Sequence, residues 1–273
     1  MIHLDNLHVT FATGTPLEKT VFNGLSLTIP AGEFITVIGS NGAGKSTLLN
    51  VLSGEIRPGC GLTAGRVTVG DRDVTPWPVA RRAKRISRVF QNPLAGSCAD
   101  LTLEENLVLA QRRSQPLTLR PALTRKQRQQ FRDRLSALEL GLENRLGDRM
   151  GLLSGGQRQA ASLVMATLAP TQVLLLDEHT AALDPKTAAY IIKLTRTLVA
   201  QQQLTTLMVT HSMQQALELG DRTLMLHEGA IALDIIGSKR EGLSVSDLLD
   251  TFATARLQDS DQAAVTDDAL LLG

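Results

Sequence analysis

Two kinds of apolar pattern divide the predicted strands of this chain into two groups. In one group apolar residues alternate with polar ones, at Ile2, Leu4, Val9, Phe11, Leu25, Leu27, Ile29, Val67 and Val69. Alternation is typical of strands with one buried face, and it predicts an antiparallel β layer. In the other group the apolar runs are continuous, at residues 34–38, 173–176, 207–209 and 224–226. Continuous runs are typical of strands buried on both faces, so they predict a central parallel sheet.

Helix signals dominate between Gln91 and Pro170. Three capping boxes, in which Ser or Thr is followed three residues later by Glu or Gln, mark helix starts at Thr102, Thr124 and Ser154. The second predicted helix carries an apolar stripe at helical spacing, formed by Phe131, Leu135 and Leu138. This part of the chain is therefore predicted to be a helical subdomain.

A further helix is predicted after Asp184, because an Asp N-cap followed by Pro at the first helical position is a common helix start. The order of elements predicts an α/β fold over residues 1–240, with the helical subdomain inserted at about 92–168. Residues 241–273 are predicted to add a short helix near Leu248 and an acidic, mobile tail, to which no chemistry is assigned.

A glycine-rich loop joins the first continuous apolar run to a helix. Residues 39–47 read GSNGAGKST and match the phosphate-binding pattern G-x-x-x-x-G-K-[ST]. Glycines let successive backbone N–H groups point at an anion, and the N-terminus of the helix adds partial positive charge. The predicted phosphate-binding residues are Gly39, Ser40, Asn41, Gly42, Ala43, Gly44, Lys45, Ser46 and Thr47.

Two side chains of this loop and two later carboxylates complete the predicted chemistry. Lys45 would neutralise the β- and γ-phosphate oxygens of ATP, and the Ser46 hydroxyl would take one position on Mg²⁺. Asp177 and Glu178 follow an apolar strand, at the end where open α/β sheets bind ligands. Asp177 would hold the Mg²⁺ shell, and Glu178 would polarise the water that attacks the γ-phosphate.

These motifs come in the order found in ABC-type ATPases, which the chain resembles over about residues 1–235. The order is Walker A at 39–47, Gln91 after a strand, LSGGQ at 153–157, LLLDE at 174–178, Leu183 with Asp184, and His211 after a strand. The combination of LSGGQ with both Walker motifs is highly specific. The stretches GSNGAGKSTLLN, GLLSGGQRQA, LLLDEHTAALDPKT and LMVTHSMQQALELGDR further resemble the ATPase subunit of bacterial importers labelled as tryptophan/tyrosine uptake systems.

The resemblance implies a P-loop fold and assigns further roles. Gln91 would sense the γ-phosphate and Mg²⁺ and touch the membrane partner, and His211 would contact the γ-phosphate. Asp184 would lie at the nucleotide. The family stacks an aromatic side chain on adenine at the position of Phe11, for which a place in the core is the alternative. His179 departs from the family, because many members carry proline after the catalytic glutamate, and this puts only loop geometry in doubt.

The resemblance also implies that two copies share each site. In the family the γ-phosphate lies between the Walker A loop of one subunit and the LSGGQ of the other, which predicts a homodimer. Each site would receive Ser154, Gly155, Gly156 and Gln157 from the second copy. The implied catalytic residues are Lys45, Gln91, Glu178 and His211, and the implied Mg²⁺ residues are Ser46, Gln91 and Asp177. The remaining histidines, His3, His8 and His227, are interpreted as structural or exposed.

Composition narrows the function classes. With 273 residues, of which 43% are hydrophobic, the chain can bury a sizeable core, and a net charge of +1 gives no general attraction to nucleic acid. Cys60 and Cys98 lack the spacing of a metal site or a disulfide framework, as expected for a reduced cytosolic location. No run approaches 18 apolar residues and the N-terminus lacks a leader pattern, so no segment is expected to cross a membrane.

Two basic stretches lack the interleaved aromatic residues that stack on bases. The first contains Arg81, Arg82, Lys84, Arg85 and Arg88, and the second contains Arg125, Lys126, Arg128, Arg132 and Arg134. The second is interpreted as a solvated helix face, with anionic lipid headgroups or permease loops as the alternative partners.

The sequence therefore predicts a MgATP-hydrolysing subunit that energises import of a small solute, such as an amino acid. Its expected partners are a second copy, integral membrane permease subunits and a substrate-binding protein, with no nucleic acid, on the cytoplasmic face of the membrane. An exporter ATPase remains an alternative. A soluble ABC ATPase of translation or DNA maintenance would carry two cassettes, a coiled-coil insertion or zinc cysteines, and a regulator without turnover would lack Glu178 or His211.

Overall fold

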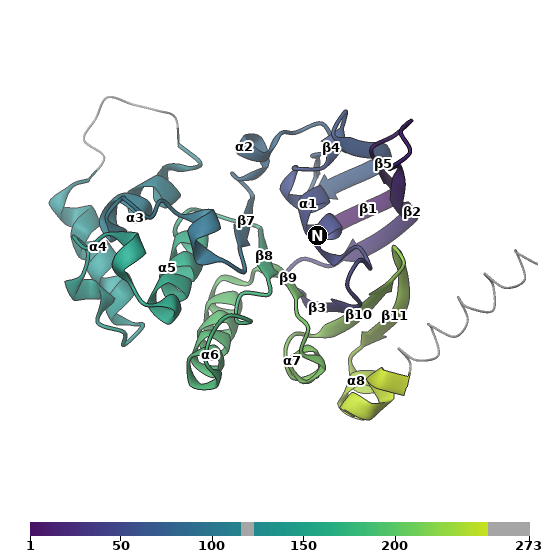
Figure 1. Ribbon diagram of the computed structural model, residues 1–273. Coiled ribbons are helices and arrows are strands. Elements are labelled where there is room, and N and C mark those ends of the chain that lie inside the picture. The colour runs from purple at the N-terminus through teal and green to yellow at the C-terminus, as the bar shows by residue number, and fades with distance from the viewer. Residues whose placement is uncertain (116–122, 251–273) are drawn as a thin grey trace, which may run out of the picture.

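The computed structural model describes residues 1–115 and 123–250. Figure 1 shows two sheets beside each other, with helices α3, α4 and α5 gathered at one side and α6 and α7 below the central strands. The acidic tail predicted after residue 250 lies outside the described residues. The short helix predicted before it is present, because residues 245–250 are helical.

The first sheet has the order β2-β1-β5-β4 with β6 paired to β5, and it is the predicted antiparallel layer except that the two-residue β4 runs parallel to β5. Its strands are β1 (Ile2–Phe11), β2 (Lys19–Ile29), β4 (Arg57–Pro58), β5 (Gly61–Val69) and β6 (Arg72–Asp73). Leu4 pairs with Leu27 on β2 and with Val67 on β5, so the alternating apolar residues share one face. That face is buried, which confirms the interpretation of the alternating pattern.

The central sheet has, in the described residues, six strands in the order β11-β10-β3-β9-β8-β7. They are β3 (Phe34–Gly39), β7 (Ile86–Val89), β8 (Val173–Asp177), β9 (Thr205–Val209), β10 (Arg222–His227) and β11 (Ala230–Ile236). Neighbours from β7 to β10 are parallel, which confirms the predicted parallel sheet. The antiparallel edge strand β11 was not predicted from the sequence. Ile235 is its one buried residue, so the strand has too few core positions to show a pattern.

The helices begin where the capping residues predicted. Thr102, Thr124 and Ser154 each form a complete capping box, and Asp184 caps the next helix with Pro185 at its first position. The helices are α1 (Lys45–Ser53), α2 (Val79–Arg82), α3 (Leu103–Arg112), α4 (Arg125–Ser136), α5 (Gly155–Leu168), α6 (Pro185–Gln202), α7 (Met213–Glu218) and α8 (Ser238–Glu241). Short 3-10 turns are η1 (Pro93–Gly96), η2 (Leu142–Asn144) and η3 (Met150–Leu152).

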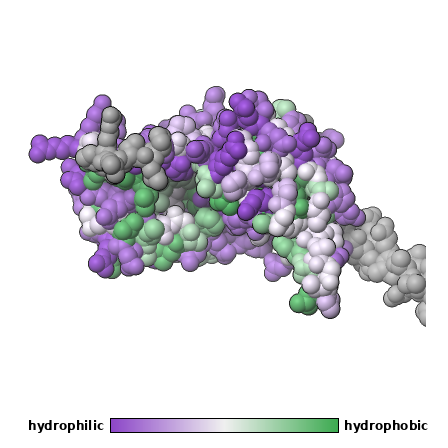
Figure 2. Space-filling view, turned by 90° about the horizontal axis from the view of Figure 1, so that it is seen from above, coloured by the Kyte–Doolittle hydropathy of each residue, from purple (hydrophilic) through white to green (hydrophobic). Residues whose placement is uncertain are grey.

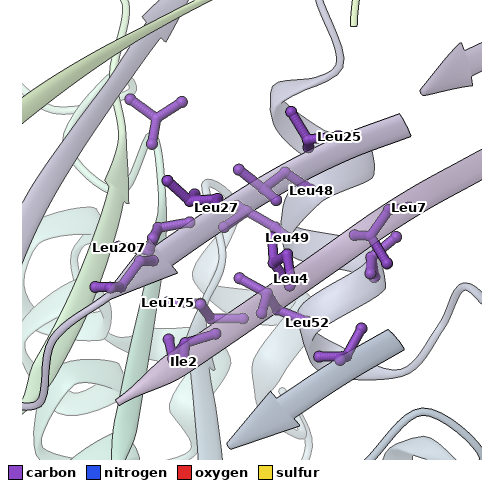
Figure 3. Packing of buried hydrophobic residues seen from close by; sticks show 14 of the residues in the cluster. Ile2, Leu4, Leu7, Leu25, Leu27, Leu48, Leu49, Leu52, Leu175 and Leu207 are labelled. Atoms are coloured by element: carbon purple, nitrogen blue, oxygen red, sulfur yellow. The ribbon is translucent and has the colours of Figure 1, made fainter. Parts of the chain in front are cut away.

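Helix α1 lies in the core between the two sheets. Figure 3 shows Leu48, Leu49 and Leu52 among leucine and isoleucine side chains of β1 and β2 on one side and Leu175 and Leu207 on the other. Each fully buried leucine contributes about 2 kcal/mol of hydrophobic stabilisation. The glycine-rich loop at the N-terminus of α1 is thus attached to a helix that both sheets hold in place.

The opposite face of the central sheet packs against the other helices. Leu174 and Leu176 point to this face, whereas Leu175 between them points to α1. The second core contains the predicted stripe of Phe131 and its neighbours together with apolar residues of α5 and α6. The basic side chains of α4 are exposed, as either a solvated face or a partner-facing surface requires, and Arg128 among them forms an ion pair with Glu104 at 2.7 Å.

Arg82 is fully buried and holds the C-terminal end of α1. Its guanidinium donates to the carbonyl oxygens of Val51 at 2.5 Å and Leu52 at 3.1 Å, and also to those of Thr75 and Trp77. The carbonyls of Val51 and Leu52 belong to the last turn of α1, where a cation is favoured by the helix dipole. Burial lowers the pKa of Arg82 to about 10, which leaves it charged at neutral pH.

Similar contacts occur at two other helices. Arg113 donates to the carbonyl oxygens of Met165, Ala166 and Ala169 at the end of α5. Arg240 donates to the carbonyl oxygens of Ala216, Leu219 and Gly220 at the end of α7.

Replacing Arg82 by Met is expected to destabilise the fold by about 3 kcal/mol, because the buried carbonyls lose their donor. The matched control is Arg81→Met, since Arg81 is exposed and stacks at 4.0 Å on the ring of Trp77, a contact worth at most about 1 kcal/mol. Urea unfolding followed by the fluorescence of Trp77, the single tryptophan, gives both values. Equal midpoints for the two variants would contradict this account of the helix end.

Candidate active site

The glycine-rich loop between β3 and α1 needs glycine for steric reasons. Gly39 has φ 153°, and a Cβ there would lie 2.3 Å from the carbonyl oxygen of Leu226 on the neighbouring strand. Gly44 has φ 104°, and its Cβ would lie 2.6 Å from Cε1 of Phe22. Both positions therefore exclude a side chain, in agreement with the phosphate-binding pattern.

The ammonium group of Lys45 lies over this loop. Its Nζ donates to the carbonyl oxygens of Gly39 and Ser40, both at 2.8 Å, and the residue is buried. Burial lowers the pKa of Lys45, while the carboxylates of Glu178 and Asp177 act in the opposite direction. The loop and the two predicted carboxylates thus form one electrostatic site, although they are more than a hundred residues apart in the chain.

Glu178 and His211 meet at the same edge. His211 Nε2 lies 2.6 Å from Glu178 Oε1, and Glu178 donates its backbone N–H to the carbonyl oxygen of Val209 at 3.0 Å. Glu178 has φ 44°, a left-handed conformation that costs a non-glycine residue on the order of 1 kcal/mol. This strained turn directs the carboxylate away from the strand and toward the loop.

A cavity of about 320 Å³ brings Phe11 and much of the glycine-rich loop together with the predicted catalytic pair. Its walls are Phe11, Lys19, Val21, Asn41, Gly42, Gly44, Lys45, Ser46, Thr47, Glu178 and His211. Phe11 is 38% exposed, so the alternative of a core phenylalanine is wrong. Its aromatic side chain lines the cavity, as stacking on a base requires.

Gln91 and the LSGGQ stretch do not line this cavity. Gln91 and Gly155 line a second cavity of about 380 Å³, together with His179 and Leu183, and no LSGGQ residue lines the first cavity within the described chain. Ser154 accepts from the N–H of Gln157 to cap α5. The carboxamide of Gln157 is occupied internally, because it bonds the N–H of Ser154, a guanidinium nitrogen of Arg145 and the carbonyl oxygen of Leu140.

The structure adds a role for the second glycine of LSGGQ. A Cβ on Gly156 would lie 2.4 Å from Cγ2 of Thr187, so glycine lets the start of α5 approach the start of α6. Asp184 caps α6 by accepting from the N–H of Thr187 at 3.1 Å, and hydrogen bonding from the Thr187 side chain and backbone lowers the pKa of its carboxyl group. The two segments that the sequence predicted at the nucleotide thus pack against each other.

Arg88 is a site residue that sequence reasoning missed. It was placed in a basic stretch, yet its guanidinium donates to Asp177 Oδ2 at 2.6 Å and to Asn50 Oδ1 at 2.7 Å. The available signal was an arginine only three residues before Gln91, which was predicted to follow a strand. Its partners depend on how β7, β8 and α1 pack, and the sequence pattern does not contain that information.

The predicted Mg²⁺ ligands fit the ion by chemistry. A hydroxyl, a carboxylate and an amide oxygen, from Ser46, Asp177 and Gln91, are hard oxygen donors of the kind Mg²⁺ prefers. No group of three or more His, Cys, Asp or Glu side chains that could hold a metal occurs in the part of the chain that the structure describes.

Comparison with known sequences supports the resemblance that the motifs indicated. A family model described as "ABC transporter" matches residues 22–181. A tyrosine transport ATP-binding protein of Clostridioides difficile (strain R20291) is 42% identical over 255 residues, covering 93% of this chain and all of that protein. A thiamine import ATP-binding protein of Escherichia coli O6:K15:H31 is 36% identical over 207 residues, covering 76% of this chain and 82% of that protein.

Solved structures agree with the sequence relatives. An ATP-binding cassette solved as a dimer in a post-hydrolysis state, bound to ADP and Pi, superposes with a TM-score of 0.72. It is 27% identical, and the match covers 86% of this chain and 98% of that one. A cassette in its ADP conformation has a TM-score of 0.74 at 23% identity, which shows a shared fold. Among the described residues, no helix combines the length and the apolarity needed to cross a bilayer.

His179, next to Glu178, gives the fold a specific sensitivity to acid. It is buried and its Nε2 lies 3.1 Å from Thr195 Oγ1, and burial lowers its pKa from 6.5 to about 4. As pH falls below 6.5 the unfolded chain therefore takes up a proton on His179 that the folded chain does not. Stability from this group is complete above pH 6.5 and is lost as pH falls toward 4, by about 2 kcal/mol between pH 7 and pH 5.

Replacing His179 by Gln, which can still hydrogen-bond Thr195, is expected to remove this part of the pH dependence. Urea unfolding at pH 7 and pH 5 measures it. The control is His3→Gln, because His3 is partly exposed and also contacts a threonine hydroxyl, Thr28 Oγ1 at 3.1 Å. A loss of stability between pH 7 and 5 that is the same in the wild type and in His179→Gln would refute the assignment.

Proposed function

The chain belongs to the family of ABC transporter ATP-binding subunits and is an ATPase, and on that premise we propose that it energises import of a small solute. Its cargo would be an amino acid or a solute of similar size. The observation that carries the proposal is the cavity in which the glycine-rich loop, Glu178 and His211 meet, in a chain that is 42% identical to a tyrosine transport ATP-binding protein over 93% of its length. An exporter ATPase and a soluble ABC ATPase are the alternatives.

ATP would occupy the cavity with its adenine on Phe11 and its phosphates on the loop. The backbone N–H groups of residues 39–47 would donate to the phosphates, and Lys45 would exchange its two loop carbonyls for phosphate oxygens. Ser46, Asp177 and Gln91 would hold Mg²⁺. When bound, Mg²⁺ neutralises the charge that develops on the phosphates.

Hydrolysis would use the pair at the sheet edge. Glu178 would accept a hydrogen bond from the attacking water and orient it toward the γ-phosphate. His211, 2.6 Å from Glu178 in this structure, is half exposed, so its ring can turn toward a phosphate oxygen. The strained backbone of Glu178 fits a residue whose carboxylate must be held in one place.

A second copy would complete each site. Ser154 is exposed at the start of the 14-residue helix α5, where the first N–H groups are available to an anion. Because no LSGGQ residue lines the first cavity of the described chain, these groups would reach the γ-phosphate of a partner. The dimeric cassette bound to ADP and Pi, at 27% identity, supports this arrangement.

The permease would dock on the helical side of the molecule, near Gln91. Figure 2 shows hydrophobic surface among polar side chains on this side. A cavity of about 380 Å³ there is lined by Phe90, Leu109 and Met165 among others, and Leu109 is 55% exposed. Such an exposed apolar patch suits an apolar segment of a partner. The protein would then act at the cytoplasmic face of the membrane, with a substrate-binding protein on the other side and no nucleic-acid partner.

Purification of the tagged chain from solubilised membranes of its own host tests the proposal. We expect it to bring down a protein with several membrane-spanning helices, in amounts that an equally tagged unrelated cytosolic protein does not. An accompanying substrate-binding protein would indicate import. Recovery with ribosomes or DNA, and without any membrane protein, would refute the transport function.

A further inference from the structure

We propose that Arg88 is a positioning residue that orients the Mg²⁺-binding carboxylate of Asp177 and ties it to the segments that carry the other two metal ligands. This inference rests on the proposed function, because it concerns the same metal. It goes beyond that proposal by assigning a role to a side chain outside the recognised motifs.

The guanidinium of Arg88 lies in the interior, between α1 and the end of β8, with 10% of the side chain exposed. Nη2 donates to Asp177 Oδ2 at 2.6 Å, and Nη1 donates to Asn50 Oδ1 at 2.7 Å and to Glu55 Oε1 at 3.0 Å. The guanidinium also lies over the ring of Phe90, 4.8 Å from its centroid. From its own segment, which continues through Phe90, the side chain therefore contacts two others, the end of β8 and the segment that contains α1.

Each of these segments carries one of the proposed Mg²⁺ ligands. Asn50 follows Ser46 by four residues on α1, which places the two side chains on the same face of the helix. Asp177 is itself a ligand, at the end of β8. Phe90 precedes Gln91 directly. Arg88 is thus the point at which the three ligand-bearing segments are held together.

The shape of the guanidinium suits this role. Its nitrogens lie in one rigid plane, so donating to Asp177 and Asn50 at once fixes the two acceptors relative to each other. A hydrogen bond to one oxygen of a carboxylate sets the plane of the group and directs the other oxygen toward a ligand. A lysine could neutralise the charge but could not span both acceptors in a fixed geometry.

Removal of the Arg88 side chain should change the affinity for Mg²⁺ in opposite directions, depending on whether Arg88 orients Asp177 or acts only through its charge. Removing the cation leaves the carboxylates of Asp177 and Glu55 without their partner and makes the site more negative. By charge alone, Mg²⁺ would then bind more tightly. If Arg88 orients Asp177, Mg²⁺ binds less tightly, because a carboxylate free to rotate has to be ordered by the ion.

The test compares the affinity for AMP-PNP, an ATP analogue that is not hydrolysed, in Mg²⁺ and in EDTA. The ratio of the two affinities measures how strongly Mg²⁺ contributes to nucleotide binding. For Arg88→Met the ratio is expected to fall about tenfold, the scale typical of residues that orient metal ligands, while the affinity in EDTA stays within about twofold. Arg88→Lys is expected to fall between Arg88→Met and the wild type.

The matched control is Arg85→Met, because Arg85 lies just before the other end of β7 and bonds Gln172 at 3.1 Å. It is expected to keep the wild-type ratio. An unchanged or increased ratio in Arg88→Met, or an equal loss in Mg²⁺ and in EDTA, would overturn the inference. If Arg88→Met does not fold, Arg88→Lys decides, since a wild-type ratio in that variant also overturns it. A wild type whose affinity is indifferent to Mg²⁺ would overturn the metal part of the proposed function as well.

Discussion

Burial of the central parallel sheet on both faces is the constraint on which the site depends. Leu175 packs into the core around α1 and the antiparallel layer, while Leu174 and Leu176 pack into the core formed with α5 and α6. Strands fixed in this way end at a common edge, and the residues that follow them must meet there. The glycine loop after β3, the two acids at the end of β8 and His211 after β9 are near one another for that reason.

Two arginine side chains in the interior lie at the C-terminal ends of helices. Helices α1 and α5 present their N-terminal ends where the predicted phosphate groups would lie, and their C-terminal carbonyls bond the buried guanidinium of Arg82 and the half-buried one of Arg113. Each arginine satisfies carbonyls that would otherwise lie unpaired in the interior. Both helices that would hold the nucleotide thus have C-terminal carbonyls bonded by an arginine.

Patterns among neighbouring residues in the sequence predicted much of the fold and of the candidate site. The glycine loop, the capping boxes at Thr102, Thr124 and Ser154, and the continuous apolar strands depend on neighbouring residues, so the sequence alone shows them. Arg88, the contact of Gly156 with Thr187, and the internal bonds of Gln157 depend on segments far apart in the chain. The edge strand β11 has one buried residue, so the pattern that reveals a strand is absent from it.

The central claim is that one chain does not complete the site, because the cavity with the glycine loop and the LSGGQ helix lie apart in the described chain. Light scattering of the Glu178→Gln variant tests it most directly, because ATP should be bound and not cleaved. Across several protein concentrations, the account predicts a dimer with ATP, a monomer with ADP, and a monomer with ATP once Ser154→Arg is added. A monomer under all three conditions, or a dimer indifferent to nucleotide, would contradict it.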